Sequence, residues 1–170
     1  MTPTPNDKPS IPSPEHLNER IELALKLLLE RDSFLIDIDA NERSISHHLA
    51  VYIKLVMPAW DIDCEYNRNG HGPKVTHLPV GDAQMDDEHA RTVYPDIIVH
   101  LRNTNANLLA IEVKKSSSGI APDYDLQKLA SYCREPLSYQ YGLFLMLRTR
   151  KNMDEPWHLE WFPKSKFSIV

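Results

Sequence analysis

Apolar residues recur at helical spacing in two stretches near the start of the chain. Ser13 and Pro14 predict where the first helix begins, because serine is a preferred N-cap and proline is favoured at the first helical position. A helix over residues 14–31 would bury Leu17, Ile21, Ala24, Leu25, Leu28 and Leu29. A helix over 41–57, ended by Pro58, would bury Ile45, Leu49, Tyr52, Ile53 and Val56.

The rest of the chain is patterned mainly as strands, with one further helix. Strands are predicted over residues 62–66, 93–99, 108–115, 141–147 and 157–161, with a helix over 122–135. The fourth of these strands is almost wholly apolar, which is typical of a strand covered on both faces, and the fifth alternates like an edge strand. The helix makes the third and fourth strands parallel, since a parallel crossover needs a dozen or more residues. The predicted fold is α/β, of the α+β kind, with a mixed sheet flanked by helices in the order α-α-β-β-β-α-β-β.

Three charged residues interrupt the second and third predicted strands: Asp96, Glu112 and Lys114. A charge inside an apolar run is unfavourable unless it is paired or bound to a metal. If Arg102 pairs with Ala106 across a three-residue hairpin loop of the kind that asparagine favours, Asp96 falls opposite Glu112. Alternation along the strand puts Lys114 on the same face as Glu112, and a register shift of one residue would break the arrangement.

These three side chains suit metal-assisted hydrolysis of a phosphodiester. Two carboxylates that lie close together raise each other's pKa, and a divalent cation removes the repulsion. Magnesium is typically held by one or two carboxylates, with waters and substrate phosphate completing its shell. The alternative is that Asp96 caps a strand, while Glu112 and Lys114 belong to a solvated stripe, because Glu-x-Lys is common on half-exposed strands.

Pro95-Asp96 and Glu112-x-Lys114 resemble the PD-(D/E)XK nuclease superfamily, which has the restriction-endonuclease-like fold. The resemblance covers about residues 41–148 and is to uncharacterised bacterial members of the superfamily. The superfamily typically adds an acidic residue on a preceding helix, where Glu42 lies, and a polar residue on the following helix. Gln127 and Lys128 lie at that last position.

The resemblance implies a nuclease that depends on Mg²⁺ or Mn²⁺ and acts on DNA, leaving a 5′-phosphate. Asp96 and Glu112 would bind the metal, and Lys114 would position or activate the attacking water. Glu42 would bind the metal through water or hold Lys114, although a carboxylate at a helix N-terminus is also favoured by the helix dipole. Gln127 and Lys128 would orient a phosphate.

Length and composition fit one domain with a proper core. The chain has 170 residues, of which 42% are hydrophobic and 25% charged. Residues 1–13 are rich in proline and are expected to form a disordered tail, followed by a single nuclease-like domain over 14–170. The polar start lacks an apolar signal core and no apolar run could span a bilayer, so a cytoplasmic protein with no membrane contact is expected. Cys64 and Cys133 are expected to be reduced.

The net charge of −5 counts against a simple non-specific DNA binder. It does not exclude a nuclease, because a metal site concentrates acidic residues. Two further alternatives stay open. One is a non-catalytic module of the same fold that binds nucleic acid or protein. The other is a homodimer, or a subunit of a restriction, repair or defence complex, in which a partner supplies specificity. The long connection over 67–92 is expected to be functional or disordered.

Overall fold

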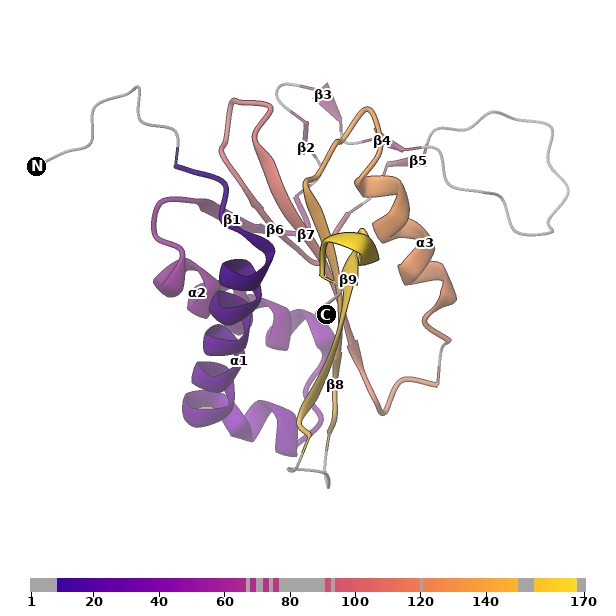
Figure 1. Ribbon diagram of the computed structural model, residues 1–170. Helices are drawn as coiled ribbons and strands as arrows, with labels where there is room; N and C mark the ends of the chain where they lie inside the picture. The colour runs from indigo at the N-terminus through magenta and orange to yellow at the C-terminus, as the bar shows by residue number, and fades with distance from the viewer. Residues whose placement is uncertain are drawn as a thin grey trace, which may run out of the picture.

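Two helices cover one face of a five-stranded mixed sheet, and a third helix covers the other face (Figure 1). The computed structural model describes residues 9–66, 94–119, 121–149 and 155–167, together with the backbone of 68–69, 72–73, 75–76 and 91–92. The helices are α1 (Pro14–Asp37), α2 (Glu42–Val56) and α3 (Asp123–Tyr132). The α/β class predicted from the sequence is confirmed.

The first helix begins where its capping residue predicts, and the second begins at Glu42, one residue after its predicted start. The Oγ atom of Ser13 accepts the backbone N–H of His16 at 3.3 Å, and Asn41 caps α2 in the same way. The predicted end of α1 at residue 31 is wrong, because the helix continues through a kink at Asp32 to Asp37. The carboxylate of Asp32 accepts the hydroxyl of Tyr52 on α2 at 2.5 Å, so a tertiary contact fixes the kink.

The sheet has the strand order β1-β6-β7-β8-β9. These strands are β1 (Asp61–Cys64), β6 (Ile97–His100), β7 (Asn107–Lys115), β8 (Tyr141–Leu147) and β9 (Trp157–Phe162). Strands β7 and β8 are parallel and the other pairs are antiparallel, which confirms the predicted crossover through α3. A short 3₁₀ helix, η1 (Lys164–Lys166), follows β9.

The hairpin of β6 and β7 has the register that the sequence predicts in its paired centre. Ile97 pairs with Ile111, and Val99 pairs with Leu109. A bulge after Val99 then shifts the pairing, so the predicted pairing of Arg102 with Ala106 is wrong. The backbone N–H of Leu101 bonds to the carbonyl of Ala106 instead, at 3.0 Å. The shift falls beyond the paired centre, so it leaves the register next to Asp96 and Glu112 unchanged.

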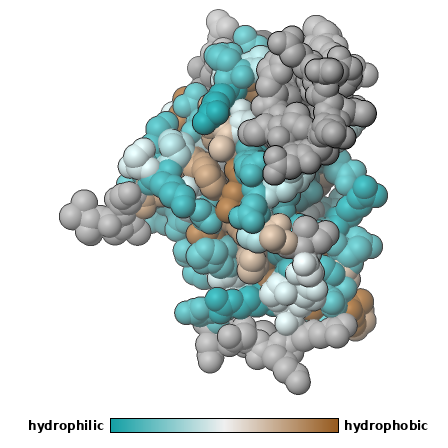
Figure 2. Space-filling view, turned by 90° about the vertical axis from the view of Figure 1, so that its right-hand side faces the viewer, coloured by the Kyte–Doolittle hydropathy of each residue, from teal (hydrophilic) through white to brown (hydrophobic). Residues whose placement is uncertain are grey.

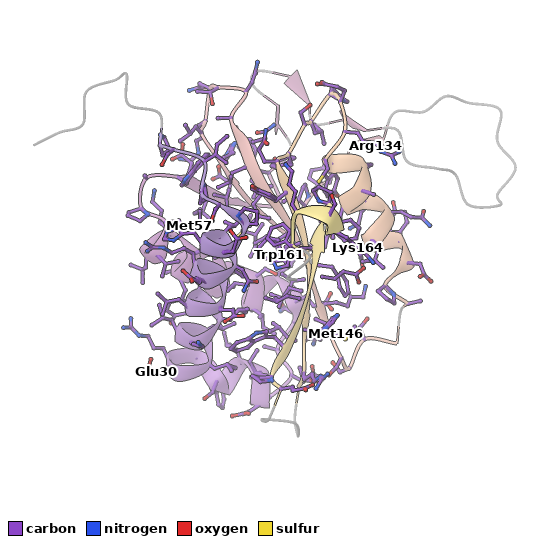
Figure 3. The ribbon with its side chains drawn as sticks, viewed as in Figure 1. Glu30, Met57, Arg134, Met146, Trp161 and Lys164 are labelled. Carbon is purple, nitrogen blue, oxygen red and sulfur yellow. The ribbon has the colours of Figure 1, made fainter. Side chains whose placement is uncertain are left out.

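The two faces of the sheet belong to two cores. The core under α1 and α2 includes five residues of the β6–β7 hairpin: Ile97, Val99, Leu109, Ile111 and Val113. Trp161 extends from β9 toward α1 (Figure 3), and its indole N–H donates to Asn18 at 2.9 Å. The smaller core under α3 includes Ile98, Ala110, Leu129, Tyr132 and Phe144. Glu112 contacts α3 and therefore lies on this second face.

Several predicted boundaries shift. Strand β1 ends at Cys64, and Glu65 takes a φ of 47°, so it does not continue the strand alternation. Helix α3 ends at Tyr132 rather than near residue 135. The 67–92 connection contains two antiparallel pairs, β2 (Arg68–Asn69) with β3 (Gly72–Pro73), and β4 (Val75–Thr76) with β5 (Arg91–Thr92). The rest of that connection, and residues 1–8 of the expected tail, lie outside the described residues.

Two smaller expectations also have outcomes. Cys64 and Cys133 are free cysteines, as predicted. No helix in the described ranges is long and apolar enough to cross a membrane.

The two faces of α2 should respond differently to truncation. Leu49 is fully buried under α1, whereas Leu55 on the same helix is 58% exposed. Leu49→Ala should lower the free energy of unfolding by about 2–5 kcal/mol, because it leaves a cavity in the larger core. Leu55→Ala should stay within about 0.5 kcal/mol of wild type. Urea denaturation of both variants measures this, and equal losses would contradict the assignment of the buried face.

Candidate active site

Asp96 and Glu112 lie next to each other where β6 and β7 meet. Asp96 directly precedes β6, and its Oδ2 atom accepts the backbone N–H of Val113 at 2.7 Å. This bond ties the carboxylate to the residue that follows Glu112 on β7. Glu112 is only 3% exposed and Lys114, two residues further, shares its face. The sequence prediction that these three side chains come together is therefore supported by the geometry.

Both oxygens of Glu112 are held by side chains of α3. The ammonium of Lys128 donates to Oε2 at 2.5 Å, and the hydroxyl of Tyr132 donates to Oε1 at 3.0 Å. Lys128 and Tyr132 are four residues apart, so they lie on one face of the helix. That face packs against β7 beside the carboxylate.

Asp125 connects the two lysines of the site. Its Oδ2 atom accepts the ammonium of Lys114 at 2.9 Å, and its Oδ1 atom accepts that of Lys128 at 3.0 Å. Asp125 and both lysines are largely buried, with side chains 13–16% exposed. Asp96, Glu112 and Asp125 thus face Lys114 and Lys128. The cluster has one more carboxyl group than ammonium groups.

Burial and like charge both act on the two predicted metal ligands. Burial raises the pKa of Glu112 to about 8, and the charge of Asp96 adds to this rise against the opposing effect of Lys128. Burial also raises the pKa of Asp96. The N–H of Val113 and the charge of Lys128 oppose that rise, while Asp125 and Glu42 add to it. The site therefore favours any additional positive charge.

Tyr132 and Lys128 of α3 keep the protonation states in which they donate hydrogen bonds to Glu112. Burial raises the pKa of Tyr132, and the charge of Glu112 raises it further, so the phenol keeps its proton and donates. Burial lowers the pKa of Lys128, but Glu112 and Asp125 outweigh this effect and the pKa is raised. Lys128 therefore stays a cation beside Glu112.

Glu42 joins the site from the other layer. Its Oε1 atom accepts the backbone N–H of Lys115 at 3.0 Å, which ties the start of α2 to the end of β7. Its charge also reaches Asp96 and raises the pKa of that carboxyl. Of the two roles predicted for Glu42, holding Lys114 falls to Asp125 instead. Binding a metal through water stays a prediction.

Gln127 and Lys128, the two site residues predicted on α3, lie on different sides of the helix. Lys128 reaches the cluster, whereas Gln127 is exposed on the helix, and its phosphate-orienting role stays a prediction. Asp125 and Tyr132 are not among the residues that the sequence predicts for the site. Their spacing is the signal that could have found them, because residues 125, 128 and 132 share a helix face.

The donor set fits a hard divalent cation. Asp96 and Glu112 offer two carboxylates, and Mg²⁺ is commonly bound by one or two carboxylates with waters and phosphate. Burial is the main cause of the raised pKa of each, and neighbouring carboxyl charges add to it, so a bound cation would favour their ionised forms. Within the residues that the structure describes, no three His, Cys, Asp or Glu side chains are grouped as ready metal ligands. Waters and substrate would have to complete the shell.

A pocket of about 180 Å³ opens beside Asp96. It is lined by Arg43 and Ser46 of α2, by Cys64 at the end of β1, and by Glu65. A larger pocket of about 460 Å³ lies between the end of α3 and β9, and none of the clustered carboxyl groups lines it. We place the candidate site at the cluster of carboxyl and ammonium groups around Glu112. Its carboxyl groups have shifted pKa values, which indicate a functional site better than pocket volume does.

Comparison with known proteins adds no assignment. The chain matches no protein-family model, no curated protein and no solved structure.

Glu112 should make the protein less stable as the pH rises. Its folded-state pKa is about 8, against 4.5 for an unperturbed glutamate. The folded chain therefore keeps a proton that the unfolded chain has lost, and stability falls between these two pH values. Glu112→Gln does not titrate and should remove this part of the fall.

Urea denaturation from about pH 5 to about pH 8 would measure this difference between the wild-type and variant curves. Glu155→Gln is the matched control, because the Glu155 side chain is 72% exposed. Parallel curves for wild type and Glu112→Gln would contradict the raised pKa.

Proposed function

We propose that this chain is a metal-dependent phosphodiester hydrolase, a nuclease of the restriction-endonuclease-like fold that acts on DNA. One observation carries the proposal. Buried Glu112 and partly buried Asp96 form a carboxyl pair at the junction of β6 and β7, with Lys114 on the same face as Glu112. Carboxyl groups whose pKa is raised by burial and by one another are typical of functional sites rather than of a protein core.

The arrangement of the elements supports the same conclusion. Strands β1, β6 and β7 follow α2, and α3 then crosses to β8, parallel to β7. A mixed sheet flanked by helices is what the resemblance to the PD-(D/E)XK superfamily implies. Of the proposed ligands, Glu112 lies on the central strand β7 and Asp96 lies just before β6, near the C-terminal end of β7.

Each side chain of the cluster would have a distinct role. Asp96 and Glu112 would hold Mg²⁺ or Mn²⁺, with Glu42 contributing through water. Lys114 would orient the attacking water and neutralise the charge that develops on the phosphate, while Asp125 keeps its ammonium in place. Lys128 and Gln127 would orient the phosphate. Tyr132 would fix the rotamer of Glu112.

When bound, the metal would polarise the phosphodiester and stabilise the charge that develops on it. The protein's own part is to supply under-compensated negative charge at a fixed point. Lys128 already neutralises part of that charge. We infer that Lys128 moves from Glu112 toward the substrate phosphate when the site is loaded.

A second candidate function is a non-catalytic module of the same fold that binds nucleic acid or protein. The contact of Lys128 with Glu112 favours it, because an ammonium that stays on the carboxylate would take the place of a metal. The two candidates differ in one measurable property, which is whether the folded protein binds a divalent cation.

For partners, we propose DNA and, as the source of sequence specificity, a second copy of the chain or another subunit of a restriction, repair or defence complex. A cytoplasmic location is consistent with these partners. Size-exclusion chromatography tests the homodimer, and a strict monomer at high protein concentration would count against it.

Millimolar Mn²⁺ should raise the melting temperature of the wild-type protein. A ligand that binds only the folded state stabilises it by about 2.7 kcal/mol at a free concentration one hundred times its Kd. The shift should grow as the pH rises toward 8, because the pKa of Glu112 is about 8 and the metal needs the carboxylate.

Thermal denaturation of Asp96→Asn should show a much smaller shift. Asp37→Asn, an exposed position at the end of α1, is the control and should behave as wild type. A shift that is unchanged in Asp96→Asn would put the ion elsewhere. The absence of a shift in all three proteins would favour the non-catalytic module.

Lys114→Ala should lose cleavage of DNA by at least about 100-fold, since a preorganised donor that stabilises developing charge typically contributes that much or more. Its fold and its Mn²⁺-induced thermal shift should remain. Lys26→Ala, at an exposed position on α1, should cleave as wild type. Gel assays of a plasmid and of oligonucleotides measure this. Full cleavage by purified Lys114→Ala would exclude the role proposed for Lys114.

A further inference from the structure

The pocket beside Asp96 is larger than an ordered water requires. Its volume is about 180 Å³, whereas one water occupies about 30 Å³ in the liquid. Asp96 lines it, so an occupant would lie directly beside the proposed metal ligand. The pocket therefore has room for a small ring next to Asp96.

One side chain in this pocket lacks a partner. Ser46 is 4% exposed, and its hydroxyl makes no hydrogen bond within the described part of the chain. Buried hydroxyl groups are nearly always hydrogen-bonded, so an exception needs an explanation. The oxygen itself is closed to solvent, so Ser46 forms part of the pocket wall, and its hydroxyl alone does not identify an occupant.

The charges around the pocket select among ligands. Two carboxylates, Asp96 and Glu65, face one guanidinium, Arg43. A second phosphate would be repelled by the carboxylates, whereas the edge of a nucleobase offers donors and acceptors together. Arg43 is bound to Glu65 at 2.7 Å, but its side chain is 83% exposed. Such a surface pair contributes little, so Arg43 can exchange Glu65 for a base at little cost.

Two exposed tyrosines flank the same cluster. Tyr94 and Tyr124 are each 49% exposed, and Tyr94 precedes Asp96 by two residues. The ring of Tyr124 lies 5.5 Å from the ammonium of Lys128, which in turn contacts Glu112. Seen from the α3 side, the described surface is largely hydrophilic, with hydrophobic residues near its centre (Figure 2). Exposed tyrosine rings in a polar surface are suited to stacking on unpaired bases.

The net negative charge of the chain also favours a single strand over a duplex as ligand. Affinity for duplex DNA comes largely from Lys and Arg contacts that neutralise its dense phosphates. This chain has 24 acidic against 19 basic residues. A single strand also needs positive contacts, but it carries half the phosphates of the duplex along its axis, and stacking on its exposed bases supplies part of the affinity.

We propose that the substrate is single-stranded nucleic acid, with one unpaired base in the pocket of Arg43, Ser46, Glu65 and Asp96, and neighbouring bases stacked on Tyr94 and Tyr124. This inference rests on the proposed function for the reaction at the site. It adds the substrate class, which the metal and the lysine do not determine.

The test compares two forms of one oligonucleotide. A fluorescein-labelled single strand of about 16 nucleotides, and the same strand annealed to its complement, are titrated with the wild-type protein. EDTA is present so that no metal-dependent cleavage consumes the probe. Fluorescence anisotropy should give a Kd at least about tenfold lower for the single strand. Equal or tighter binding of the duplex, or no binding of either form, overturns the proposal.

Variants then test the residues. Tyr124→Ala should weaken binding of the single strand by roughly ten- to one-hundredfold, whereas Tyr124→Phe keeps the ring and should bind as wild type. Arg43→Ala should weaken binding by about tenfold, as expected for loss of a good base contact. Both positions are exposed, so neither change should unfold the protein.

Phe34→Ala is the control, since Phe34 is 68% exposed on α1, in the layer opposite α3. It should bind as wild type. The proposal requires both Tyr124→Ala and Arg43→Ala to bind more weakly, and wild-type affinity in either one overturns it.

The outcome can be separated from that of the proposed function. Tight single-strand binding without metal-dependent cleavage would keep this inference and remove the nuclease. Metal-dependent cleavage of duplex DNA without preference for single strands would do the reverse.

Discussion

The organisation of the site depends on one buried carboxyl group, Glu112, at the centre of the sheet. Its strand is covered by helices on both faces, so the side chain lies where water cannot solvate its charge. Lys128 and Tyr132 each take one of its oxygens. These contacts fix the position of α3 along β7, because moving the helix by one turn would leave a buried carboxyl group without hydrogen-bond partners.

The same constraint links the two helical layers. Asp96 lies beside Glu112 and accepts the backbone N–H of Val113 on β7. Glu42 on α2 accepts the backbone N–H of Lys115, two residues further along the same strand. Carboxylates from three elements thus converge on the end of β7. Hydrogen bonds offset part of their mutual repulsion, but the pKa of Asp96 and that of Glu112 stay raised. This remaining imbalance is the physical reason to look for a cation there.

The sequence predicted the parts of the site that follow from strand alternation. The register of Asp96 against Glu112 depends on the pleat and on the hairpin, and the bulge falls beyond the residues that matter. The contributions of Asp125 and Tyr132 depend on how α3 is rotated against the sheet. The apolar pattern of α3 does not determine how the helix is rotated about its axis, because leucine and alanine residues lie beside these polar positions. The continuation of α1 past Asp32 depends on a contact with α2, which local pattern does not contain.

Lys128 stabilises the free protein at the position where a bound metal would have to lie. In the free protein its ammonium balances Glu112 and Asp125, and without it the cluster would keep three carboxyl groups against one lysine. A metal at Glu112 would make that balance unnecessary and would repel the ammonium. Asp125 offers Lys128 a second partner that does not involve Glu112, so the side chain can leave the carboxylate without losing every contact. The bridging position of Asp125 between both lysines is therefore what would let one site be stable when free and reactive when loaded.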